Sequence, residues 1–124
     1  MFNKLLSLEE IKEEPYVIEH IRWDIEPRLL MERTTGTAAN GRIIKDTLIG
    51  YVFYIDNIDK KPVLSLMRHT AADYAETLAQ IVEIPAELLK EAIEDGKDRV
   101  YFSMYPINKK IEAWLKKELG VAAD

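Results

Sequence analysis

The sequence predicts an α+β fold, in which a small, mostly antiparallel sheet of about four strands carries helices packed on one face. Strand-like and helix-like segments are largely segregated along the chain, which is typical of this class. Two β-rich runs separated by a turn cluster indicate a hairpin, and two later segments with helical periodicity end at a glycine. The 124 residues, of which 48% are apolar, fit a single domain (residues 1–124) with one core.

The N-terminal part of the chain contains a short helix and one ambiguous segment. Ser7 and Glu10 have the spacing of a capping box, so a helix is expected to begin there. Residues 16–27 fit a helix, with apolar residues four apart, and also a strand, with apolar and charged residues alternating. We expect a helix that gives way to an extended segment near Trp23, although the pattern leaves helix or strand open for residues 16–27.

The middle of the chain has the strongest strand signal. Residues 28–33 are expected to form a short strand, and the glycines and threonines of residues 34–41 indicate a loop. Residues 46–56 are dominated by β-branched and aromatic side chains and predict the central strand. A turn cluster at residues 56–61 then leads into residues 62–68, which are expected to form the return strand of a hairpin.

The second half of the chain is expected to contain three helices and one strand. Thr70 resembles a helix cap, and the apolar spacing that follows predicts a helix over residues 71–83. A proline and a glycine bound a second helix over residues 86–95. Residues 99–104 are expected to add a further strand after this two-helix crossover. The last helix is predicted over residues 107–119, where a glycine ends it.

The central strand is apolar on both of its faces. A half-exposed antiparallel strand would alternate apolar and polar side chains, whereas residues 48–55 do not. Something must therefore cover the second face. The N-terminal segment of the same chain, a second copy in a symmetric dimer, or a ligand in a pocket lined by Tyr51 or Tyr54 would each do so.

Composition and charge exclude several classes of function. The chain has no cysteine, which excludes disulfides, zinc–thiolate sites and cysteine nucleophiles. The net charge of −5 argues against binding to nucleic acid, which needs a concentrated basic surface. No apolar run approaches the roughly 20 residues of a membrane helix, and the first residues are too quickly charged for a signal peptide. A cytoplasmic protein without membrane contact is therefore expected.

Two places in the sequence are candidates for binding an anion. Arg68 and His69 precede the helix expected from Thr70, and the free N–H groups of a helix start favour anions. His69 would also be the candidate general base. Arg33 and Arg42 flank the glycine-containing loop and could contribute a second set of contacts. The simpler interpretations are that Thr70 only caps the helix and that the loop is a plain connection.

The sequence predicts no metal site and no cofactor. The two histidines, His20 and His69, are far apart in the chain and neither has a second histidine at helical spacing. Our leading hypothesis is a small cytoplasmic, non-catalytic binding module that forms a homodimer and binds a protein partner or a small anionic ligand. The alternative is an enzyme that acts on a small anionic substrate through His69 and Arg68.

Overall fold

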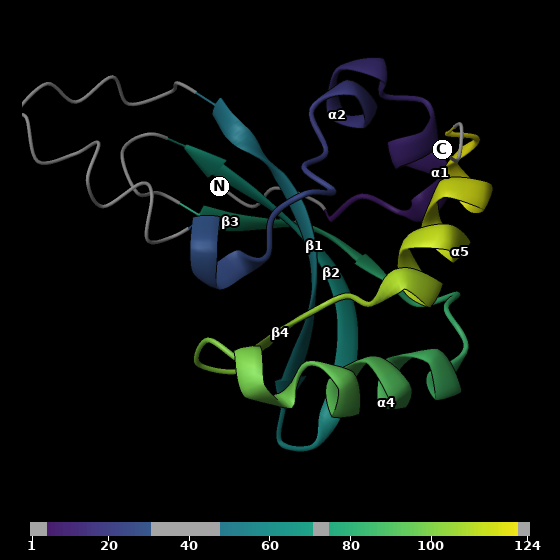
Figure 1. Ribbon diagram of the computed structural model, residues 1–124. Coiled ribbons are helices and arrows are strands. Elements are labelled where there is room, and N and C mark those ends of the chain that lie inside the picture. The colour runs from purple at the N-terminus through teal and green to yellow at the C-terminus, as the bar shows by residue number, and fades with distance from the viewer. Residues whose placement is uncertain (1–4, 31–47, 71–74, 122–124) are drawn as a thin grey trace, which may run out of the picture.

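The computed structural model describes residues 5–30, 48–70 and 75–121 (Figure 1). It contains a four-stranded antiparallel sheet in the order β3-β2-β1-β4, with helices on one face, which confirms the predicted α+β class. The elements in chain order are α1 (Leu8–Lys12), α2 (Pro15–Glu19), β1 (Leu48–Ile58), β2 (Lys61–Thr70), β3 (Ala75–Ile81), α4 (Ala86–Asp95), the 3₁₀ turn η1 (Lys97–Arg99), β4 (Met104–Pro106) and α5 (Lys109–Leu119).

The predicted hairpin of β1 and β2 is confirmed. Its register pairs Ile55 with Leu64 and Phe53 with Leu66 on the same face of the sheet. The two turn residues, Asp59 and Lys60, both have positive φ (54° and 62°), as the tightest hairpin turns require. This turn matches the right-handed twist of the strands that it joins, so the long hairpin forms the centre of the sheet.

The helix predicted over residues 71–83 is wrong, because residues 75–81 form strand β3. Residues 71–74 lie outside the described part of the chain. The segment contains good helix formers, but helix propensity is a weak prior that tertiary pairing overrides. Ala79 and Ile81 are buried opposite Leu66 and Leu64 of β2, whereas the intervening Gln80 is exposed. This alternation follows the strand period, and β2 supplies the partner that decides it.

Two further strand predictions are corrected. Residues 27–30 are helical rather than extended, and the remainder of the predicted strand (31–33) is not described. Pro27 begins this helical turn, a position that its fixed φ suits. The strand predicted over residues 99–104 instead consists of η1 and a tight turn, and β4 begins only at Met104. The crossover from β3 to β4 therefore contains one α-helix, α4, and not two.

The other predicted helices are confirmed. Ser7 and Glu10 form the capping box of α1, with hydrogen bonds of 3.2 and 2.9 Å. Helix α4 has the predicted bounds, and α5 begins two residues later than predicted because Asn108 caps it. Residues 16–27 contain most of α2 and then a short extended stretch at Ile21, which is the order that the sequence favoured, but Trp23 lies in a turn and not in an extended segment.

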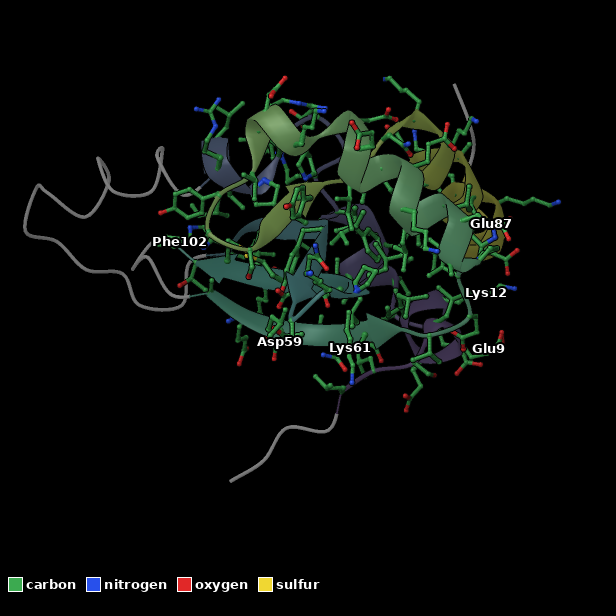
Figure 2. All side chains as sticks on the ribbon, turned by 90° about the horizontal axis from the view of Figure 1, so that it is seen from below. Glu9, Lys12, Asp59, Lys61, Glu87 and Phe102 are labelled. Carbon is green, nitrogen blue, oxygen red and sulfur yellow. The ribbon has the colours of Figure 1, made fainter. Side chains whose placement is uncertain are left out.

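One core lies between the sheet and its helices. In Figure 2, α4 and α5 lie on the same side of the sheet. The core combines one face of β1, β2 and β3 with apolar residues of α1, α2, α4 and α5. Its members that are fully buried in the described residues include Ile11, Ile55, Leu64, Leu66, Ala79, Ala92, Ile111 and Leu115.

Both faces of β1 are buried within a single copy of the chain. Tyr51, Phe53 and Ile55 belong to the core described above, and Val52 and Tyr54 on the opposite face are also buried. The two apolar faces therefore do not require a second copy to cover them. The homodimer predicted from the sequence loses this argument, and whether a dimer forms has to be argued from another surface.

Candidate functional site

The predicted anion site at Arg68, His69 and Thr70 lies at the end of a strand. All three residues lie in β2, and Thr70 pairs with Leu48 rather than capping a helix. His69 and Thr70 are fully buried. Thr70 is a strand residue, so it does not supply the helix cap from which the anion site was predicted.

Arg68 and His69 also lie on opposite faces of the sheet, because neighbouring strand residues alternate. Arg68 is on the face of Tyr51, its partner across the hairpin, and its Nη1 lies 3.8 Å from Oε1 of Glu76. The two side chains do not converge on one small ligand. Arg33 and Arg42, the other candidate anion-binding residues, lie outside the described residues.

Arg68 interacts with the buried hydroxyl of Tyr51. Burial raises the pKa of Tyr51 above its ordinary value of 10.0, and the hydrogen-bonded Arg68 guanidinium opposes this effect. Because the folded state holds the proton more tightly than the unfolded chain, the contribution of Tyr51 to stability is complete below about pH 10. It is lost as the pH rises through the raised pKa of the folded state.

We expect Tyr51→Phe to make the stability of the protein less sensitive to alkaline pH. Urea midpoints measured between about pH 8 and about pH 11.5 should fall less steeply for the variant than for the wild type. At neutral pH the variant should be less stable by about 1 kcal/mol, because it lacks the hydrogen bond to Arg68. Equal slopes for the two proteins would contradict the assignment to Tyr51.

A cleft of about 670 Å³, which we call the α4–α5 cleft, lies on the surface of the described part of the chain. It lies between residues 22–29 on one side and residues of α4, η1 and the start of α5 on the other. This volume is in the ordinary range for ligand sites, roughly 300–1,000 Å³. Its lining residues are Arg22, Trp23, Asp24, Ile25, Glu26, Leu29, Phe53, Glu91, Asp95, Arg99, Pro106, Ile107, Asn108, Lys109, Lys110 and Glu112.

Aromatic and aliphatic side chains line part of the α4–α5 cleft. The rings of Trp23 and Phe53 stack with centroids 5.7 Å apart and an interplanar angle of 27°. Nζ of Lys116 lies 5.3 Å from the Trp23 ring centre, a cation–π contact that further fixes the indole. Phe53 belongs to the core face of β1, so this apolar lining is anchored to the most buried part of the sheet.

Ion pairs hold the elements around the cleft together. Arg99 Nη1 donates to Glu26 Oε2 at 3.1 Å and so joins the end of η1 to the 22–29 segment. Lys110 Nζ donates to Glu91 Oε2 at 2.9 Å, which joins α5 to α4. These pairs are at least partly exposed, and each contributes roughly 1 kcal/mol or less, so a ligand can exchange them for its own charges.

The remaining carboxylates of the cleft also have partners. Asn108 Nδ2 donates to Asp95 Oδ2 at 2.9 Å while its Oδ1 caps α5. Asp24 pairs with Arg22, and Glu112 pairs with Lys116 at 2.9 Å. Among the described lining residues, none is a serine, threonine, cysteine or histidine. The arrangement offers paired polar groups around apolar side chains, which suits binding and positioning.

The 22–29 wall is attached to the sheet through β1. Tyr51 N–H donates to His20 O at 3.1 Å, and Arg22 N–H donates to Tyr51 O at 2.7 Å, which places Ile21 as a short parallel extension of the sheet. Gly50 makes this approach possible, because a Cβ there would collide with Cγ of Arg22. The geometry of the cleft therefore depends on a glycine in the central strand.

Sequence reasoning did not find the α4–α5 cleft. The sequence left residues 16–27 open between helix and strand, and it did not single out the residues of α4 and α5 that line the cleft. The alternation of apolar and charged residues over 22–26 is the signal that could have indicated one wall of the cleft. Trp23 and Ile25 alternate there with charged side chains, and such a pattern is typical of a segment between the core and solvent. The opposite wall could not be located without the tertiary structure.

Comparison with protein-family models, curated proteins and solved structures gives no match. Within residues 5–30, 48–70 and 75–121, no group of three or more histidine and carboxylate side chains is arranged to hold a metal ion. In the same ranges, no helix has the length and apolarity needed to cross a membrane. The function therefore has to be argued from the cleft itself.

Proposed function

We propose that this chain is a non-catalytic binding module whose ligand is a short protein segment held in the α4–α5 cleft. The observation that carries this proposal is the composition of the cleft, which surrounds an apolar lining with charges of both signs. Among the described lining residues, four side chains are basic and five are acidic. A peptide presents apolar side chains, amide groups and both charges, and so matches this mixture better than a small anion does.

The pairing of the cleft carboxylates supports binding rather than catalysis. Each carboxylate of the cleft has at least one oxygen engaged by lysine, arginine or asparagine, which favours a positioning role, and Glu26 Oε1 is buried without a hydrogen bond. The enzymatic alternative through His69 and Arg68 has no observation in its favour, because His69 is 0% exposed. The absence of cysteine in the sequence is consistent with a cytoplasmic location for the module.

The test is a titration of the ¹⁵N-labelled protein with a blocked pentapeptide, Lys-Ala-Phe-Ala-Asp. We expect amide shifts that cluster at residues 22–29 and at the start of α5, together with a shift of the Trp23 indole. The same peptide with serine in place of phenylalanine should cause much smaller shifts, because the apolar lining would lose its occupant. Scattered shifts, or none up to about 5 mM peptide, would overturn the proposal.

Two variants and a second probe sharpen this experiment. Leu29→Glu places a charge at the apolar lining on a partly exposed position and should abolish the shifts without unfolding the chain. Val82→Ser is the matched control, because Val82 is exposed and does not line the cleft. Inorganic phosphate should leave the cleft unchanged; shifts centred on Arg68 and His69 would favour the anion-binding alternative instead.

A further inference from the structure

The side chain of Phe102 projects from the surface. It is 83% exposed. Figure 2 shows it at the margin of the molecule, on the opposite side from Glu87 and Lys12. Aromatic side chains, phenylalanine among them, are enriched in the cores of protein–protein interfaces. Phe102 therefore merits a specific explanation.

The turn that carries Phe102 holds it in a backbone conformation that favours glycine. Tyr101 and Met104 exchange two backbone hydrogen bonds of 2.9 Å, which closes a two-residue turn. Phe102 is the first of the two turn residues and has φ of 56°. Glycine is preferred at this position in turns with positive φ at the first residue only. A phenylalanine here is a local disadvantage for folding, which points to a use for its side chain.

The turn is also fixed to the sheet. Asn57 N–H donates to Ser103 O at 3.1 Å, and Ser103 Oγ donates to Asp56 Oδ1 at 2.9 Å. The rings of Tyr101 and Phe102 meet edge to face with centroids 4.7 Å apart. Since the aromatic ring is already held in place, little conformational entropy is lost when a partner covers it.

Phe102 lies beside the α4–α5 cleft of its own chain. Arg99, shortly before the turn, and Pro106, shortly after it, both line the cleft. A projecting aromatic and a partly apolar cleft are therefore neighbours on one surface. Two copies related by a two-fold axis between these features can place each projecting ring in the cleft of the other, because a two-fold interface uses the same patch on both copies.

We propose that Phe102 inserts into the α4–α5 cleft of a second copy of this chain, and that the second copy reciprocates. This names the partner of the proposed function and rests on it. The mixed charges of the cleft allow two copies to meet despite the net charge of −5, since acidic and basic side chains are available on both sides. A standard interface covers about 800 Å² on each partner, which is about a tenth of the 7946 Å² surface of this chain.

Sedimentation velocity from about 1 to about 200 µM tests the proposal, and we expect a reversible dimer in this range. Phe102→Gly should raise the dissociation constant of the dimer about 1,000-fold. The variant removes both inserted rings, and the loss of each ring should weaken the dimer about 30-fold. Glycine adopts positive φ without strain, so this variant should be at least as stable to urea as the wild type, and loss of the dimer cannot be attributed to unfolding. A wild type that stays monomeric at about 200 µM would overturn the proposal.

Mixing two variants tests whether the ring enters the cleft. Phe102→Gly keeps an intact cleft and Leu29→Glu keeps the ring, so each should be monomeric alone. The mixture restores one of the two contacts, and we expect a heterodimer about 30-fold weaker than the wild-type dimer. If each variant is monomeric and the mixture is too, Phe102 and the cleft do not meet, and the proposal is wrong.

Val82→Ser is the control, because Val82 is 82% exposed and does not line the cleft; the dissociation constant of its dimer should equal that of the wild type.

The pentapeptide titration separates this proposal from the proposed function. Peptide binding at the cleft of a strictly monomeric protein would overturn the dimer and leave the binding module standing. If the protein neither binds the peptide nor forms a dimer, the proposed function and the proposed dimer are both wrong. Vesicle binding that depends on Phe102 in a monomeric protein would assign the ring to a lipid surface and overturn the dimer.

Discussion

Replacing Ile55 by alanine should lower the free energy of unfolding by about 3–5 kcal/mol. Ile55 is 0% exposed in the middle of β1, where Leu64 of β2 and Tyr105 of β4 flank it. Removing its branched side chain loses the transfer free energy of the buried atoms and leaves a cavity that neighbouring strands cannot fill without moving. Since a domain of this size is stable by about 5–15 kcal/mol, the variant should be close to unfolding.

Chemical unfolding in urea, followed by tryptophan fluorescence, measures this loss. Ile58→Ala is the matched control, because it makes the same change in the same strand at a residue that is 57% exposed. The control should change the stability by less than about 0.5 kcal/mol. If both variants lost the same stability, the core face of β1 would have been assigned incorrectly.

Gly50→Val should have the second largest effect, a loss of about 2–4 kcal/mol together with loss of peptide binding. The new side chain would collide with Cγ of Arg22 and approach the carbonyl of His20. The 20–22 segment would have to move away from β1 and stretch its two hydrogen bonds to Tyr51. Overpacking of this kind costs about 1–3 kcal/mol, and a lost hydrogen bond adds about 1 kcal/mol. The wall of the α4–α5 cleft would move with the segment.

A double-mutant cycle with Arg22→Ala isolates the collision. Arg22→Ala alone removes the Cγ atom and the exposed ion pair with Asp24, and should cost less than about 1 kcal/mol. Combined with Gly50→Val it should restore part of the lost stability, so the two changes should be clearly non-additive. Strict additivity would show that the close approach of Gly50 and Arg22 is not what limits substitution at this position.

Elements with local signals at both ends were predictable from the sequence. Helix α4 begins after a proline and ends at Gly96, and α1 has its capping box within four residues. The hairpin was equally clear, because its turn residues lie between two β-rich runs. In each of these cases the residues that determine the structure are neighbours in the chain.

Strand β3 and the cleft were not predictable, because their determinants are distant in the sequence. Residues 75–81 become a strand only because β2 offers a register that buries Ala79 and Ile81. The cleft depends on contacts such as that between Glu26 and Arg99, which are 73 positions apart. The anion site at Thr70 was predicted from a helix cap that the extended pairing of β2 replaces. Local patterns did not contain this information.

The two short parallel contacts of the N-terminal segment have a consequence for the order of folding. Leu6 N–H bonds to Leu78 O beside β3, and Ile21 runs beside Tyr51 of β1, so residues near the start of the chain complete the sheet along two of its margins. These residues are synthesised before the strands that they contact. This segment therefore cannot dock on the sheet until the hairpin and β3 have been made, and until then the open strand margins are exposed to misassociation between nascent chains.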